Sequence, residues 1–341
     1  MKYDIYAIGN ALVDSEIEVS DQFLADNGIA KGEMTLVDEA RQAALVAALN
    51  SHNQHHQRAS GGSACNTVVG ASQLGAKAYY ACRVADDDTG RFFVSALTQA
   101  GVDTNMQLLI PGGTSGKCLV MVTPDAERTM NTFLGISETV SAEDLDWQAV
   151  QDSRYVYIEG FLVTSDAARA ATLKLRDTAK AAGGKVALTF SDPAMARFFA
   201  PGLTEMLGDG VDVLFCNREE AELFTGESTP EAALEKLKGY ARSVVMTCGP
   251  QGALIYEQGE THKVAGEKVD AIDTNGAGDA FAGAYLFGLC QGFSAELAGE
   301  LASMSAAQVV SQFGPRLSAA DQQAVYQNFL ARHPQLAAKL A

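Results

Sequence analysis

The feature that most constrains the fold of this chain is a repeated alternation of short apolar runs with longer segments of helical periodicity. The apolar runs have the length of single strands: Tyr3–Ile8, Ala78–Cys82, Tyr155–Ile158, Val186–Phe190, Val211–Phe215 and Val244–Thr247. Segments with helical spacing lie between most of them: Thr67–Leu74, Gly90–Ala100, Ala167–Ala182 and Asn217–Phe224. Such alternation is typical of a parallel sheet buried by helices on both faces. We therefore predict an α/β fold with a central, mostly parallel sheet flanked by helices.

Two regions interrupt this alternation. Residues 11–36 and 105–134 contain runs in which apolar and polar residues alternate, and turn sequences such as PGGTSG and TPDAE separate them. One polar and one apolar face suit a small antiparallel sheet that leaves one side open to solvent or to a ligand. We predict a small β lid formed by 11–36 and 105–134, beside one large α/β domain formed by 1–10, 37–104 and 135–341.

The charge of the chain limits its partners. The 341 residues include 25 Lys and Arg and 42 Asp and Glu, which gives a formal net charge of −17 at pH 7. A protein that coats nucleic acid needs clustered basic residues, and an anionic membrane surface likewise attracts basic segments. We therefore expect neither nucleic acid nor a membrane among the partners, although a small anionic ligand is compatible with this charge.

The cysteines and the first residues point to the cytoplasm. The six cysteines include no CxxC pair and no zinc-ribbon spacing, as expected for reduced thiols. Residues 1–14 lack the basic start, the long apolar core and the cleavage site of a signal peptide. No run reaches the roughly 18 apolar residues that a membrane helix requires. We predict a cytoplasmic protein.

The segment Asp273–Leu286, DTNGAGDAFAGAYL, carries the strongest chemical signal. A polar turn leads into a predicted helix that begins near Ala277, with Gly276 and Gly278 on either side. Backbone N–H groups of this turn lack intrahelical partners and the helix dipole adds positive charge, so the turn suits an anion. Asp279 falls in the first helical turn, where it either caps the helix or accepts a proton from a hydroxyl that attacks a phosphoryl group.

Three motifs resemble those of the ribokinase-like (PfkB) family of carbohydrate and nucleoside kinases. Asp273–Phe281 is similar to the family signature, Gly61–Asn66 with Val84–Gly90 resembles a second motif, and Asn217–Glu220 resembles the NxxE motif. They occur in the family order over most of the chain. One departure is Ala85, where the family usually has glycine. The resemblance implies the ribokinase-like fold and a kinase that uses ATP and Mg²⁺.

The resemblance assigns phosphoryl transfer to one end of the predicted helix. Asp279 would be the base toward the acceptor hydroxyl, and the backbone of Gly276, Ala277 and Gly278 would form the anion hole for the moving phosphoryl group. Arg128, at the edge of the lid, would neutralise phosphate charge, and a solvated strand position is the alternative.

The same resemblance implies a nucleotide site with magnesium. Asn217 and Glu220 would position the nucleotide phosphates and Mg²⁺, with Glu220 on the metal side and largely through water, and a helix cap is the alternative for Asn217. The other residues implied on the nucleotide side are Thr247, Gly249, Gly252, Asp273 and Asn275. Some relatives bind a monovalent cation such as K⁺ near the turn at Asp273, so this cation is expected as an option here.

The acceptor side follows from the resemblance as well. The residues expected to hold the hydroxyls of a ribose or sugar are Asn10, Asp14, Gly61, Gly62 and Asn66. Asn and Asp side chains match vicinal diols, which present a donor and an acceptor close together. A helix cap is the alternative role for Asn66.

Three segments resemble adenosine kinases more than sugar kinases: GNALVD at 9–14, Asn275 within DTNGAGD, and YIEGFLVT at 157–164. Candidates for an apolar slot for the base are Leu36, Leu134 and Phe161. We predict that adenosine is phosphorylated on its 5′-hydroxyl, which gives AMP and ADP. The alternatives are a sugar kinase of the fructokinase or ribokinase type, an inosine–guanosine kinase and a non-catalytic nucleoside or sugar sensor. Either a monomer or a homodimer through the lid is compatible with the resemblance.

Overall fold

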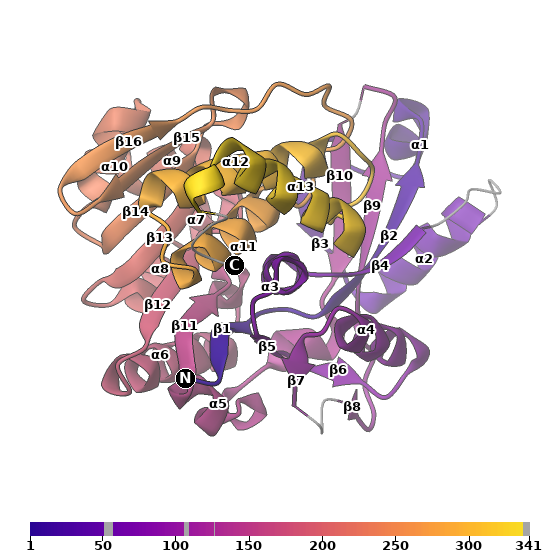
Figure 1. Ribbon diagram of the computed structural model, residues 1–341. Helices are drawn as coiled ribbons and strands as arrows, with labels where there is room; N and C mark the ends of the chain where they lie inside the picture. Colours follow the sequence, from indigo (N-terminus) through magenta and orange to yellow (C-terminus); the bar gives the residue numbers. More distant parts are fainter. Residues whose placement is uncertain (51–56, 106–108, 126, 337–341) are drawn as a thin grey trace.

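The computed structural model describes residues 1–50, 57–105, 109–125 and 127–336, and its centre is a nine-stranded sheet (Figure 1). In spatial order its strands are β16 (Glu260–Val264), β15 (Ala253–Glu257), β14 (Ala241–Thr247), β13 (Val211–Asn217), β12 (Lys185–Thr189), β11 (Ser153–Ile158), β1 (Tyr3–Ile8), β5 (Ala78–Ala81) and β7 (Asp103–Thr104). All neighbouring pairs from β14 to β7 are parallel, and β15 and β16 add an antiparallel edge. The predicted mostly parallel sheet is confirmed.

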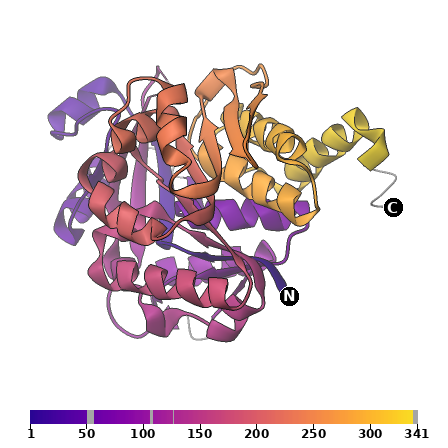
Figure 2. The same ribbon diagram turned by 90° about the vertical axis from the view of Figure 1, so that its left-hand side faces the viewer.

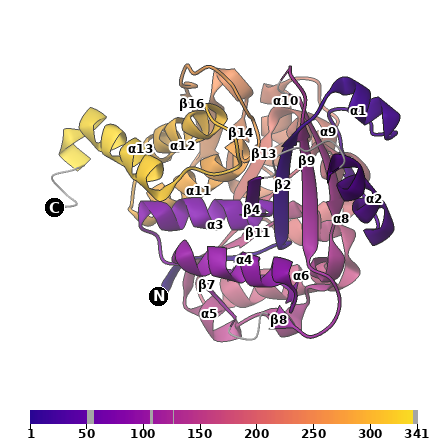
Figure 3. The ribbon, with the colours of Figure 1, turned by 90° about the vertical axis from the view of Figure 1, so that its right-hand side faces the viewer.

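Helices cover both faces of this sheet (Figures 2 and 3). As a result, its central strands are buried on both sides. The helices with buried side chains in the core of one face are α3 (Ser63–Leu74), α4 (Asp88–Gln99), α11 (Ala277–Cys290), α12 (Ala295–Val310) and α13 (Ala319–Arg332). Those in the core of the other face are α5 (Trp147–Gln151), α6 (Asp166–Ala181), α7 (Pro193–Phe198), α8 (Ala200–Leu207), α9 (Arg218–Thr225) and α10 (Pro230–Leu237). The 3₁₀ turns are η1 (Gly135–Thr139), η2 (Ala142–Asp144), η3 (Gly160–Thr164) and η4 (Gly249–Gln251). No described helix is long and apolar enough to span a bilayer.

A separate five-stranded sheet forms the lid, beside the large sheet in Figure 1. Its order is β3 (Met34–Leu36), β10 (Arg128–Phe133), β9 (Gly116–Val122), β2 (Leu12–Glu18) and β4 (Gln57–Gly61), and α1 (Asp21–Asp26) and α2 (Glu39–Asn50) accompany it. The sheet is mixed and not purely antiparallel as predicted. The pairs β2–β4 and β9–β10 are antiparallel, whereas β2–β9 and β3–β10 are parallel. Between β2 and β9 the chain adds strands to the large sheet and returns in the same direction, which makes that pair parallel.

Two details differ from the segments expected in each part. The run 105–110 includes 106–108, which lie outside the described residues, and β8 (Leu109–Ile110) pairs with β6 (Val84–Ala85) rather than with the lid. Within 37–104, β4 belongs to the smaller sheet, and α2 buries Leu45 and Leu49 in its core. The boundaries between the large domain and the lid stay a prediction.

The parallel strands bring polar residues together at one edge of the large sheet. Asn10 follows β1, Glu159 follows β11, and Thr189, Asn217 and Thr247 end β12, β13 and β14. In α/β sheets, ligands bind outside the carboxyl ends of the strands. The fold therefore predicts the functional site at this edge.

Candidate active site

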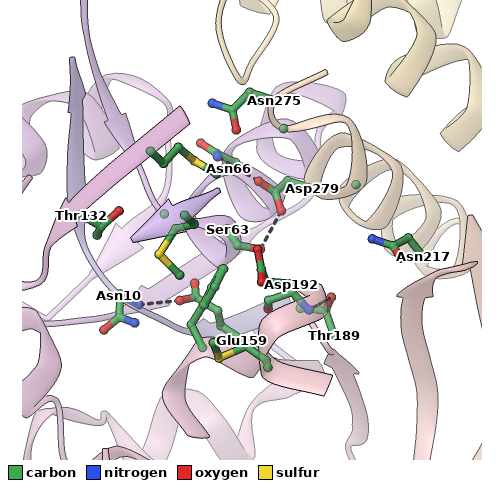
Figure 4. A pocket seen from close by; sticks show the side chains of 18 of the residues that line it. Asn10, Ser63, Asn66, Thr132, Glu159, Thr189, Asp192, Asn217, Asn275 and Asp279 are labelled. Atoms are coloured by element: carbon green, nitrogen blue, oxygen red, sulfur yellow. Dashed lines mark hydrogen bonds between the residues drawn. The ribbon is translucent and has the colours of Figure 1, made fainter. Parts of the chain in front are cut away.

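A cavity of about 430 Å³ lies at this edge, between the large sheet, the start of α11 and the lid. The predicted site residues that line it are Asn10, Asp14, Gly62, Asn66, Arg128, Asn217, Glu220, Thr247, Asn275, Gly276, Gly278 and Asp279. Those that do not line it are Gly61, Gly249, Gly252, Asp273 and Ala277. Figure 4 shows that the labelled polar side chains come from both the large sheet and the lid.

The turn before α11 has the shape expected of an anion hole. Gly276 has φ of +73°, and a Cβ there would lie 2.1 Å from the carbonyl oxygen of Pro315, so only glycine fits. Nothing lies within 4 Å of a Cβ built on Gly278, which leaves open space beside the first helical turn. The Ala277 N–H donates to the Thr274 carbonyl at 3.4 Å. The remaining first-turn amides have no intrahelical acceptor and lie at the positive end of the dipole.

Asp279 is held by two donors at the floor of the cavity (Figure 4). Its Oδ1 accepts a hydrogen bond from Ser63 Oγ at 2.6 Å, and its Oδ2 accepts one from Asn66 Nδ2 at 2.9 Å. Burial raises the pKa of Asp279 to about 6, and the two donors and the charge of Arg316 oppose that rise. A carboxylate with this pKa is ionised at neutral pH and is basic enough to accept a proton.

Ser63 was missed in the sequence, although it lies inside the Gly61–Asn66 motif. It is the first residue of α3 and the one hydroxyl in that motif, which is the signal that could have identified it. Its hydrogen bond orients Asp279, so Ser63 belongs to the site as a positioning residue.

Two glycines let the acceptor side pack closely. A Cβ on Gly61 would lie 2.1 Å from Asp14 Oδ2, and Gly62 has φ of +99° with the Asn10 carbonyl oxygen 2.1 Å from where its Cβ would be. The Asp14 carboxyl is buried, and burial raises its pKa to about 7. Among the described residues, the buried Asn66 Oδ1 has no hydrogen-bond partner. An acceptor hydroxyl would satisfy that oxygen, since buried polar atoms are rarely left unpaired.

Glu159 is a second residue missed in the sequence. It is 1% exposed, and it accepts hydrogen bonds from the backbone N–H groups of Asn10 at 3.2 Å and Ala64 at 2.9 Å. Burial raises its pKa to about 7. The signal was available, because an acid that directly follows a buried strand reaches the carboxyl edge of the sheet.

The NxxE motif forms a capping box at the start of α9. Asn217 Oδ1 accepts from the Glu220 N–H at 2.8 Å, and Glu220 accepts from the Asn217 N–H at 2.9 Å and from its Nδ2 at 2.8 Å. Burial raises the pKa of Glu220 to about 8. The helix cap considered as an alternative for Asn217 is therefore present, and it also holds both side chains at the cavity wall.

These residues fit magnesium only as an indirect partner. The described residues contain no cluster of three or more His, Cys, Asp or Glu that could hold a metal ion. Both oxygens of Glu220 already accept from Asn217. Mg²⁺ usually keeps several waters and binds substrate phosphates, so Glu220 would reach it through water. The indirect role of Glu220 stays a prediction.

Gly249 and Gly252 shape the turn between β14 and β15. Their φ values are +56° and +92°, and a Cβ on Gly252 would lie 2.0 Å from the Val264 carbonyl oxygen. They allow the chain to reverse beside Thr247, which does line the cavity. Their contact with the nucleotide stays a prediction.

Arg128 lies in a buried cluster of charges. Its guanidinium forms an ion pair with Asp273 and lies 3.6 Å from Glu16 Oε1. Asp273 is buried, and it also accepts hydrogen bonds from the N–H groups of Asn275 and Gly314, each at 2.8 Å. The Asp273 carboxylate is thus surrounded by donors and a guanidinium rather than by the oxygen ligands that a cation needs. A monovalent cation near this turn stays a prediction.

The chain as a whole is similar to known proteins. Residues 31–322 match the pfkB family carbohydrate kinases. The chain belongs to this family. An adenosine kinase of Schizophyllum commune is 29% identical to it over 91% of this chain and 97% of its own length. The protein is therefore a phosphotransferase with an alcohol group as acceptor, and the family implies that it binds ATP and typically Mg²⁺.

Two solved structures show the same fold over nearly the whole chain. The adenosine kinase from Sinorhizobium meliloti is 33% identical, with a TM-score of 0.90 over 96% of this chain and 100% of that one. A probable sugar kinase from Rhizobium etli is 32% identical, also with a TM-score of 0.90, over 96% of this chain and 99% of that one. The ribokinase-like fold of this PfkB kinase is thereby confirmed, and its acceptor is a nucleoside or a sugar.

Proposed function

We propose that this PfkB kinase transfers the γ-phosphoryl group of ATP to the 5′-hydroxyl of adenosine. The observation that carries the proposal is the combination of Asp279, held by Ser63 and Asn66, with an apolar wall on the lid side of the same cavity. The apolar side chains on that wall are Leu12, Met34, Leu36, Met130 and Leu134, and Phe161 of η3 adds an aromatic ring from the large domain. A purine base needs such a surface, whereas a small sugar presents mainly hydroxyls.

The chemistry then follows from the position of each group. Asp279 accepts the proton of the 5′-hydroxyl as the hydroxyl oxygen attacks the γ-phosphorus. The bond between that phosphorus and the bridging oxygen breaks, and ADP leaves with the electron pair. Backbone donors near Gly276 and Gly278 stabilise the charge on the transferred group. When bound, Mg²⁺ neutralises phosphate charge.

Arg128 has a conditional part in this scheme. Its guanidinium is paired with Asp273, yet it lies on the lid strand β10 and lines the cavity. To neutralise the transferred phosphoryl group it would have to leave Asp273 when the lid closes over both substrates. This role belongs to the proposal.

The second candidate is a sugar kinase. It is supported by the likeness to the probable sugar kinase from Rhizobium etli, which is as similar in fold as the adenosine kinase. The two candidates differ in the use of the apolar wall, because only a nucleoside has a base to place there.

The deciding experiment is ADP formation from ATP with a panel of acceptors. We expect the highest kcat/KM with adenosine, lower values with inosine and guanosine, and little turnover with ribose or fructose. The analogue 5′-deoxyadenosine should compete with adenosine without being phosphorylated, because it keeps the base and lacks the reacting hydroxyl. Faster turnover of a sugar than of every nucleoside would overturn the proposal in favour of the second candidate.

A further inference from the structure

The loop before α13 contacts both the anion-hole turn and the acceptor side of the active site. The Gly314 N–H donates to Asp273 Oδ2 at 2.8 Å, and the Pro315 carbonyl packs against Gly276. The next residue is Arg316. The loop therefore contacts the anion-hole turn just before its chain reaches the acceptor side.

Arg316 makes the contact on the acceptor side. Its Nη2 donates to Ser60 Oγ at 2.9 Å, and its Nη1 lies 4.0 Å from Cys65 Sγ. Ser60 and Cys65 are buried, and Cys65 precedes Asn66, the residue that donates to Asp279. Among the described residues, no carboxylate lies within the 4.0 Å ion-pair distance of Arg316. The guanidinium therefore connects the loop to the residues around the start of α3, and it does so without an ion pair to a carboxylate.

The positive charge of Arg316 acts on three buried groups of this floor, Asp14, Cys65 and Asp279. The titratable groups whose charges act on one another around this floor are Asp14 and Glu16 of β2, Cys65 of α3, Tyr80 of β5, Tyr157 of β11, and Glu159, Glu220 and Asp279. Two guanidinium groups oppose them at Asp14, those of Arg316 and Arg128. At Asp279 the opposing charge is that of Arg316.

We propose that Arg316 is a positioning residue for phosphoryl transfer, which ties the acceptor floor to the anion-hole turn and favours the ionised form of Asp279. A guanidinium remains protonated at every physiological pH, so its effect is permanent. In a protein of net charge −17, it supplies local positive potential without a wide basic surface. The inference rests on the proposed function, because it takes Asp279 as the base.

The experiment compares pH profiles of kcat/KM for the acceptor in the wild type, Arg316→Met, Arg316→Gln and Arg316→Lys. Turnover should require ionised Asp279, so the wild type should lose activity as the pH falls through about 6. In Arg316→Met and Arg316→Gln we expect the pH at which activity is half lost on the acid side to rise by about one unit. At pH values below that point, kcat/KM should be roughly tenfold lower than in the wild type, and at higher pH the difference should be smaller. Arg316→Lys keeps the positive charge, so its activity should be lost at nearly the same acidic pH as in the wild type.

The matched control is Arg58→Met. Arg58 and Arg316 line one hollow on the surface, beside the loop before α13. Arg58, however, stacks on the Phe92 ring, with 4.7 Å from Cζ to the ring centroid. In Arg58→Met, activity should be lost at the same acidic pH as in the wild type.

The possible results separate two failures. Loss of activity at the wild-type acidic pH in Arg316→Gln and Arg316→Met, with activity lowered equally at all pH values, would overturn the charge role and leave only a structural one. If Arg316→Met does not fold, Arg316→Gln and Arg316→Lys still decide, since both retain a hydrogen-bond donor. Full activity of Asp279→Asn would instead refute Asp279 as the base, which is the part of the proposed function on which this inference rests, whatever the Arg316 variants do.

Discussion

At the scale of single residues, the reaction depends on one carboxylate. Asp279→Asn keeps the size and the contacts of the side chain but removes the group that accepts the proton. We expect kcat to fall by about a hundredfold or more, while ATP affinity stays nearly unchanged. Steady-state kinetics and ATP titration calorimetry measure the two effects separately. Near-wild-type turnover would exclude Asp279 as the base.

Asn66 separates the two substrates. Its Nδ2 donates to Asp279 and its Oδ1 is buried without a partner among the described residues. Asn66→Ala should raise the KM for the acceptor several-fold more than the KM for ATP, because the acceptor hydroxyl loses a buried hydrogen bond. Equal changes in both constants would contradict a role on the acceptor side.

The two glycines at the start of α11 should respond differently to one methyl group. Gly276→Ala places a Cβ at positive φ and against Pro315, so it should lower the free energy of unfolding by about 1–2 kcal/mol and impair turnover. Gly278→Ala meets open space within α11, and because alanine favours a helix more than glycine does, thermal stability should be unchanged or slightly higher. Thermal unfolding of the pair gives a matched comparison, and equal melting temperatures would contradict the description of this turn.

How much of the site could be predicted depends on how local each contact is. The turn at Gly276–Asp279 and the capping box at Asn217 are each formed by residues close in sequence, so both can be predicted from short sequence patterns. The pairing of Arg128 with Asp273 joins the lid to the far end of the chain. No local pattern encodes such a pair, and the same holds for Arg316 and Ser60.

At the scale of elements, the lid strand β3 tests which acceptor is bound. Leu36 at its end lines the cavity and is 50% exposed. Leu36→Ser should therefore cost little stability but raise the KM for adenosine several-fold, because a bound base would cover that side chain. Phe198→Ser is the control, since Phe198 is 69% exposed and does not line the cavity. An unchanged KM in Leu36→Ser would remove β3 from the base slot.

Elements were easier to predict than their pairing. The strands of the large sheet follow from runs such as Tyr3–Ile8, whose apolar character reflects burial on both faces. The lid strands were located by alternation at 11–36, but alternation does not reveal which strand lies beside which. The parallel pair β2–β9 depends on the path of the chain through the large sheet, which no short pattern contains.

At the scale of the whole molecule, the buried acids make stability depend on pH. Burial raises the pKa values of Asp14 and Glu159 to about 7 and that of Glu220 to about 8, from ordinary values of 3.8 and 4.5. Between about pH 4 and pH 8 the folded state therefore binds more protons than the unfolded state. The free energy of unfolding should fall as the pH rises through this window, and urea unfolding at a series of pH values measures it.

A pair of variants isolates the cause of that slope. Glu220→Gln cannot ionise but can still complete the capping box, so its stability should fall less steeply with pH. Glu235→Gln makes the same substitution at an exposed position and should keep the wild-type slope. Equal slopes in the two variants would assign the effect to overall charge repulsion instead.

The ion pairs of the lid differ in their depth. Arg128 meets Asp273 and Glu16 where its side chain is 8% exposed, whereas Lys31 meets Asp21 and Asp125 at the outer surface. Dissolved ions screen exposed charges strongly and enclosed charges much less. As ionic strength rises, the Lys31 pairs within the outer part of the lid should weaken before the Arg128–Asp273 pair that joins the lid to the large domain. Salt would therefore loosen the lid itself before it releases the lid from the rest of the molecule.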